Sequence, residues 1–131
     1  MNNKSSVSKA FNKHFFEFLN DILNVYPDNK DIQYAITSFE TIKRFNVTAI
    51  IKVWYTQVFQ QYKEHIEQGN IDFFIDKDYS KDLDGVKKSD EILKMIDNIR
   101  NPIKSMDEKN KDFCVKYIQN LSKLSGLYNS L

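Results

Sequence analysis

Residues 47–68 constrain the fold most, because apolar side chains surround nearly the whole circumference of the helix that they predict. The apolar positions are Val47, Ile50, Ile51, Val53, Trp54, Tyr55, Val58, Phe59, Tyr62 and Ile66. A surface helix carries one apolar stripe, whereas a helix that is apolar on several sides is buried by several neighbours. Gly69 follows at the position where a left-handed residue commonly ends a helix. We therefore predict a central helix over residues 47–68, with the rest of the chain packed around it.

Other segments carry single apolar stripes at helical spacing. The first has Phe11, Phe15, Phe18, Ile22 and Val25 at intervals of four, three, four and three residues. Further stripes fall within residues 32–42, 92–99 and 113–124. A chain of 131 residues is long enough for one core. The sequence predicts an all-α single domain, a bundle of about five helices over residues 9–126. Residues 1–8 are expected to be a flexible N-terminus, and residues 127–131 a C-terminal tail beyond Gly126.

Residues 70–85 interrupt the helical pattern and predict an irregular connection that is both aromatic and acidic. An aromatic patch with an acidic rim suits a protein partner with basic edges. The alternative is that the two phenylalanines plug the end of the bundle while the aspartates face water. The candidate partner-binding residues are Phe73, Phe74, Asp76, Asp78 and Asp82.

The same aspartates have part of the spacing of a calcium-binding loop. Counted from Asp76, acidic or hydroxyl side chains fall at positions one, three, five, seven and nine. Position six, which requires glycine, is Lys81, and position twelve, which requires a bidentate glutamate, is Lys87. A metal-dependent protein that uses the aspartates of residues 76–84 is therefore the weaker alternative, and we predict no metal site and no cofactor.

Lysines provide a second alternative, a nucleic-acid-associated factor. The lysine-rich C-terminal helix supplies Lys104, Lys109, Lys111, Lys116 and Lys123, and Lys4, Lys9 and Lys13 form a separate group near the N-terminus. Three observations weigh against this function. The net charge is only +1, acidic residues interrupt the C-terminal group, and the chain has only two arginines.

Candidate catalytic residues are sparse. Cys114 is the single cysteine and is expected to be a partly buried, inert thiol. His14 and His65 lack the spacing of a metal-binding pair and are expected at the surface. The three glycines leave little from which to build a phosphate-binding loop. We therefore predict no catalytic residues and a protein that is not an enzyme.

Three stretches together resemble a set of small all-helical proteins, of unassigned function, that large nucleocytoplasmic DNA viruses of algae and amoebae encode. They are residues 11–18 with 25–28, residues 69–79, and residues 117–124. The resemblance implies expression inside an infected cell, in the host cytoplasm or the virion. The lone cysteine and the absence of a signal peptide or a membrane-spanning run agree with an intracellular, non-secreted protein.

The function that the sequence favours is therefore a non-enzymatic interaction or structural protein of such a virus, virion-associated or an accessory to replication. A protein partner is expected, a nucleic-acid partner is not favoured, and no membrane is involved. The partner's identity and the oligomeric state are left open.

Overall fold

The computed structural model describes residues 3–70 and 98–131, and every regular element in these ranges is a helix. The elements are α1 (Lys4–Val25), α2 (Lys30–Phe45), α3 (Ala49–Trp54), the π-helix η1 (Tyr55–Phe59), α4 (Gln60–Glu67) and α7 (Glu108–Ser130). Residues 98–104 are also helical. The predicted all-α single-domain bundle is confirmed.

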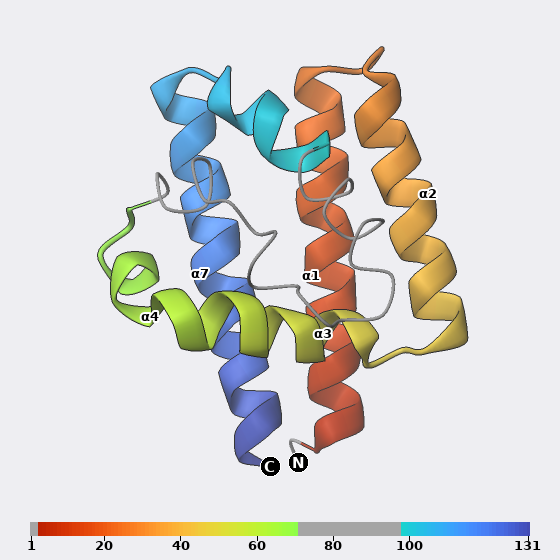
Figure 1. Ribbon diagram of the computed structural model, residues 1–131, viewed down its shortest axis with the longest axis vertical. Coiled ribbons are helices and arrows are strands. Elements are labelled where there is room, and N and C mark those ends of the chain that lie inside the picture. Colours follow the sequence, from red (N-terminus) through yellow and green to blue (C-terminus); the bar gives the residue numbers. More distant parts are fainter. Residues whose placement is uncertain (1–2, 71–97) are drawn as a thin grey trace.

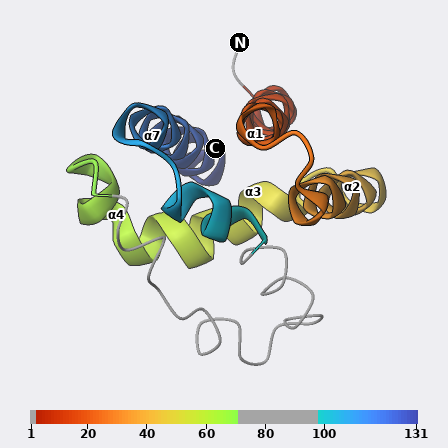
Figure 2. The same ribbon diagram turned by 90° about the horizontal axis from the view of Figure 1, so that it is seen from above.

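Three long helices run side by side, and a fourth segment crosses them. α1 runs upward in Figure 1, while α2 and α7 run downward on either side of it. The α3–η1–α4 segment crosses beside them, which the view from above shows most clearly (Figure 2). α1 contacts α2, α3 and α7, and α3 in turn contacts α2 and α7. The prediction that residues 47–68 are central is therefore correct.

The sequence predicted one regular helix over residues 47–68, but the central segment is irregular. It begins as α3, widens into the π-helix η1 and continues as α4, with non-helical dihedral angles at Tyr62 (φ −131°, ψ 26°). A π-turn takes up an extra residue and changes which side chains face the neighbouring helices. The predicted end at Gly69 is correct, because its φ is +74° and the Asn70 amide donates to the His65 carbonyl at 2.9 Å.

Both terminal helices extend beyond their predicted bounds. α1 begins at Lys4, where the Asn3 side chain accepts a hydrogen bond from the Ser6 amide, and Val7 is already buried. At the other end, α7 continues through Gly126 to Ser130. Gly126 serves close packing instead of ending the helix, since a Cβ there would lie 2.9 Å from Cε2 of Phe59.

The core lies where α1, α3 and α7 meet. Phe11 has no exposed surface, and its ring packs against those of Phe15 and Trp54 with centroids 6.1 Å away in each case. The indole nitrogen of Trp54 donates to Ser122 Oγ at 2.9 Å, which ties the central segment to α7 inside the core. The expectation that Trp54 is a core residue is confirmed.

Candidate functional site

The residues predicted to bind a partner lie outside the described part of the chain. Phe73, Phe74, Asp76, Asp78 and Asp82 all fall between residues 71 and 97. The aspartates of the weaker metal-binding alternative fall there too. In the described ranges, no group of three or more His, Cys, Asp or Glu side chains is arranged to hold a metal ion.

The lysines of the nucleic-acid alternative are spread along α7 and the segment before it. Lys109, Lys116 and Lys123 are exposed and lie on one side of α7, because a spacing of seven residues is close to two helical turns. Glu108 and Asp112 are exposed beside them. α7 therefore presents a mixed charged surface here.

A larger concentration of positive charge surrounds a groove that the sequence did not predict. The groove has a volume of about 1020 Å³ and lies between α1 and the C-terminal end of α2. Its five cationic residues are Lys4, Lys9, Lys13, Lys43 and Arg44, and its two carboxylates are Glu17 and Glu40. We call this feature the basic groove. Its formal charge of +3 exceeds the net charge of +1 of the whole chain.

Aromatic rings position two of these cations. The Lys43 ammonium lies 4.8 Å from the centroid of the Phe16 ring, and the Lys4 ammonium lies 5.3 Å from that of Tyr128. A cation over a ring face is attracted by the ring quadrupole while the lysine stem covers apolar surface. The basic groove therefore combines positive charge with an aromatic lining.

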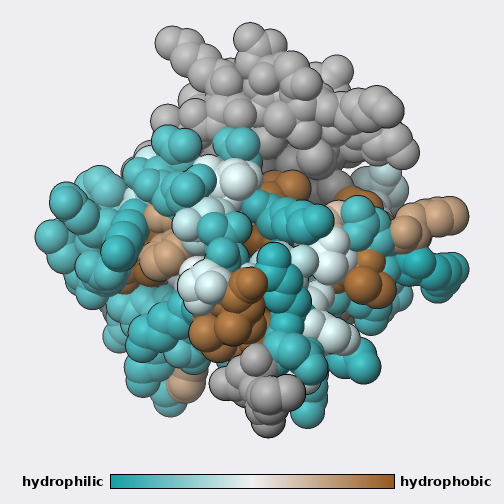
Figure 3. Space-filling model, turned by 90° about the horizontal axis from the view of Figure 1, so that it is seen from below, coloured by the Kyte–Doolittle hydropathy of each residue, from teal (hydrophilic) through white to brown (hydrophobic). Residues whose placement is uncertain are grey.

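Two buried polar residues of α1 fix one end of the basic groove. Asn12 Nδ2 donates to the Val47 carbonyl at 2.8 Å, and Ser8 Oγ donates to the same oxygen at 3.2 Å. These bonds hold the connection between α2 and α3 against α1. Phe45 (84%) at the end of α2 and Val47 (60%) in the connection are two of the large apolar side chains exposed at the surface. The view from below shows several hydrophobic patches among hydrophilic surface on this face of the molecule (Figure 3).

Only part of the basic groove has a signal in the sequence. Lys9 and Lys13 are four residues apart, so they share a side of α1. Lys43 and Arg44 are 30 residues further along the chain, and no local pattern relates them to α1. Their place in the groove follows from the antiparallel packing of α2 on α1.

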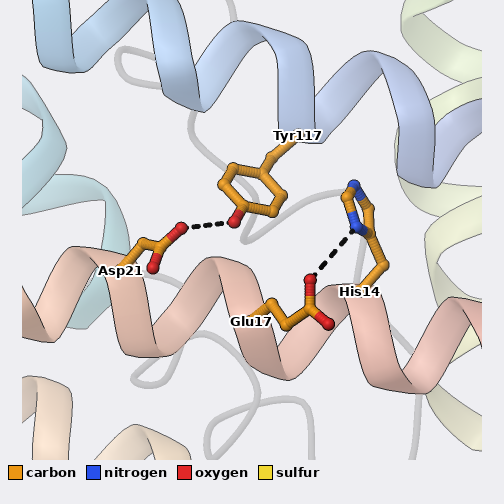
Figure 4. A network of polar contacts seen from close by, with 4 residues as sticks. All are labelled: His14, Glu17, Asp21 and Tyr117. Atoms are coloured by element: carbon orange, nitrogen blue, oxygen red, sulfur yellow. Dashed lines mark hydrogen bonds and ion pairs between the residues drawn. The ribbon is translucent and has the colours of Figure 1, made fainter.

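A polar network joins α1 to α7 and shares Glu17 with the basic groove (Figure 4). The Tyr117 hydroxyl donates to an Asp21 carboxylate oxygen, and His14 Nδ1 lies 3.9 Å from Glu17 Oε2. The His14 and Tyr117 rings are also in contact, with centroids 4.7 Å apart. Burial and the hydrogen bond to Asp21 raise the pKa of Tyr117 to about 12. A phenol that keeps its proton donates stably to the carboxylate, so this network links α1 to α7.

Cys114 lies beside this network in a small, largely apolar hollow of about 260 Å³ between α1 and α7. The thiol is 4% exposed and contacts Met106 Sδ at 3.7 Å. Burial, with a smaller contribution from the Asp21 charge, raises its pKa to about 12. A thiol that stays protonated is a poor nucleophile. The sequence predicted a partly buried, inert thiol. The structure buries the thiol more completely than predicted, and the raised pKa favours low reactivity.

The raised thiol pKa predicts a loss of stability in alkali. The unfolded chain loses this proton near pH 9 and the folded chain only near pH 12, so ionisation favours unfolding between these values. The stabilisation that comes from the protonated Cys114 thiol is fully present below pH 9. As the pH rises above this value, the free energy of unfolding falls by up to about 1.4 kcal/mol per pH unit. Urea unfolding of the wild type and of Cys114→Ala from pH 8 to pH 11 measures it. The variant is expected to show a shallower decline, and equal slopes would contradict the assignment.

Searches against protein-family models, curated proteins and solved structures found no match to this chain. None of the helices in the described ranges is both long enough and apolar enough to cross a membrane.

Proposed function

We propose that this chain is a non-enzymatic interaction protein that binds an acidic segment of a protein partner in the basic groove. The single observation that carries the proposal is the meeting of five cationic residues from α1 and α2 around one hollow. Complementary charge attracts such a segment and selects against basic competitors. The resemblance to viral helical proteins supports the further proposal that the protein acts inside cells infected by a large DNA virus.

The size and lining of the basic groove favour a macromolecular segment over a small metabolite. Its volume of about 1020 Å³ lies at the upper limit of small-molecule pockets. Val47 lines the groove and is exposed, and Phe45, which follows Arg44 in the chain, is exposed as well. These two side chains offer apolar contacts to a chain that extends beyond the groove. Central apolar contacts with a charged surround are the usual anatomy of a protein interface.

The same features favour a protein segment over nucleic acid. Glu17 and Glu40 line the basic groove and would repel a continuous phosphate backbone, whereas a peptide can avoid them. Four of the five cations are lysines, and only Arg44 offers the planar fork that suits phosphate recognition. The nucleic-acid alternative, with the lysines of residues 104–123, is kept as an outcome of the test.

Fluorescence anisotropy with a labelled peptide of alternating glutamate and leucine clusters tests the proposal. Wild-type protein is expected to bind this peptide more tightly than a peptide with lysine in place of glutamate. The Lys9→Glu/Lys13→Glu/Arg44→Glu variant is expected to bind at least about tenfold more weakly, because three favourable charges become repulsive. Lys43 is left unchanged so that its contact with Phe16 is preserved.

A matched variant, Lys109→Glu/Lys116→Glu/Lys123→Glu, makes the same change of charge on α7 and is expected to bind the acidic peptide nearly as tightly as wild type. Equal weakening by both variants would contradict the proposal, because it would show a response to net charge alone. Tighter binding of a single-stranded oligonucleotide than of the acidic peptide, lost in the α7 variant, would contradict it in favour of the nucleic-acid alternative.

A further inference from the structure

The charges of the basic groove are ordered along its length. On α1 the order is Lys4, Lys9, Lys13 and then Glu17, and on α2, read in the reverse direction, it is Arg44, Lys43 and then Glu40. Each helix thus carries its cations towards one end of the groove and a carboxylate towards the other. The order becomes a property of the groove only if the two helices are aligned so that like charges coincide.

Contacts between α1 and α2 show how the two helices are aligned. The Phe15 and Phe39 rings pack with centroids 5.0 Å apart, and the Lys43 ammonium, one turn further along α2, lies 4.8 Å from the centroid of the Phe16 ring. Towards the other end, Asn12 Nδ2 reaches the Val47 carbonyl. Antiparallel packing therefore places Glu40 within about one turn of Glu17, and places Lys43 and Arg44 near Lys13, with Lys9 and Lys4 further towards the same end. We call these two ends the acidic end and the basic end.

The walls of the groove favour a helical occupant. The main chains of α1 and α2 are hydrogen-bonded within their own helices, so they offer no row of free amides and carbonyls to pair with an extended segment. A helical segment pairs its main-chain amides and carbonyls with one another, so it needs no hydrogen bonds from the main chain of the groove. The wall formed by α1 from Lys4 to Asn20 is about 24 Å long at about 1.5 Å per residue, the length of a helix of about 16 residues.

We infer that the occupant is an acidic amphipathic α-helix of a partner protein, with its C-terminus at the basic end of the groove. This inference rests on the proposed function and adds the conformation and polarity of the bound segment. A helix carries partial negative charge at its C-terminus and partial positive charge at its N-terminus. The inferred orientation places the negative end beside Lys9, Lys13 and Arg44, and the positive end beside Glu17 and Glu40.

The apolar face of such a helix also has a place to pack. Phe16 and Val47 line the groove, and Phe45 is exposed next to its basic end. A helix with leucines at intervals of three and four residues lays these side chains along one face. Glutamates on its flanks then reach the lysines on the α1 side and Arg44 on the α2 side.

Paramagnetic NMR with a 16-residue peptide tests both the conformation and the polarity. The peptide carries leucines at helical spacing and glutamates on the flanks, evenly distributed between its halves, with a nitroxide on a cysteine at either the N- or the C-terminus. The buried Cys114 of the protein is protected from the label. The C-terminal label is expected to broaden amide signals around Lys9 and Arg44, and the N-terminal label those around Asn20 and Glu40. The reverse pattern, or equal broadening at both ends, would overturn the inferred polarity.

Two companion measurements separate this inference from the proposed function. Circular dichroism is expected to show a gain of peptide helicity on binding. A variant peptide with a central proline is expected to bind at least about tenfold more weakly, because proline breaks the interior of a helix. If the proline peptide binds equally well and charge reversal in the groove still weakens it, the occupant is extended: the inference fails while the proposed function stands. If neither peptide binds, the proposed function itself fails.

Glu17→Lys/Glu40→Lys provides the matched control for polarity. It makes both ends of the groove basic while leaving the cations and the apolar lining in place. The variant is expected to bind the peptide at least as tightly as wild type but to lose the directional pattern, with each label broadening signals at both ends. A directional pattern that persists unchanged would show that these two carboxylates do not orient the bound helix.

Discussion

Replacing Phe11 with alanine is expected to lower the free energy of unfolding by about 3–5 kcal/mol, the usual cost of removing a buried phenylalanine ring. Phe11 has no exposed surface, and its ring contacts Phe15 and Trp54 at the junction of α1 with the central segment. The loss combines the transfer of the ring with the cavity that it leaves. Urea denaturation followed by far-ultraviolet circular dichroism measures it.

Phe45→Ala provides a control with the same chemical change at a site of opposite burial. Phe45 is 84% exposed, so its replacement is expected to change the free energy of unfolding by no more than about 0.5 kcal/mol. Similar losses in the two variants would show that Phe11 does not occupy the core. Because Phe45 lies beside the basic groove, the same variant also measures how much its ring contributes to peptide binding.

Replacing Trp54 with alanine is expected to cost a similar amount, about 3–5 kcal/mol. The Trp54 side chain is buried between α1 and α7. Its ring makes edge-to-face contacts with the rings of Phe11 and Phe15, at interplanar angles of 68° and 79°. Unlike Phe11, it also carries a buried polar group, the indole N–H that donates to Ser122 Oγ at 2.9 Å. The measurement is again the free energy of unfolding in urea.

A double-mutant cycle separates the hydrogen bond from the packing. Trp54→Phe removes the donor, and Ser122→Ala strands the donor in the core, which costs about 1–3 kcal/mol. The double variant removes both partners, so its cost is expected to be smaller than the sum of the two single costs. Additive costs would show that the indole and the hydroxyl do not interact.

Most of the helical architecture could be predicted from local patterns. The stripe of Phe11, Phe15 and Phe18 marks the buried face of α1, and all three side chains are buried. Gly69 ends α4 as predicted, because a left-handed residue satisfies the last carbonyls of a helix whatever surrounds it.

The predictions that failed were those in which local signals competed with packing. Gly126 has the local signature of a helix end, yet α7 continues because the glycine makes room for Phe59 and because Tyr128 beyond it is buried. The first eight residues look polar, but Val7 and Ser8 turn towards the core once α1 is placed. The irregularity at η1 and Tyr62 likewise has no signal in a segment that is apolar on nearly every side.

The candidate site likewise has a part that could be predicted from the sequence and a part that could not. Which segments become helices and which faces they bury could be predicted from the sequence alone, because these depend on the spacing of apolar residues a few positions apart. The sequence also placed Lys9 and Lys13 on one side of a helix. Only the tertiary structure joined them to Lys43 and Arg44, since that meeting requires the antiparallel alignment of α1 and α2 that their buried rings and the Asn12–Val47 hydrogen bond establish.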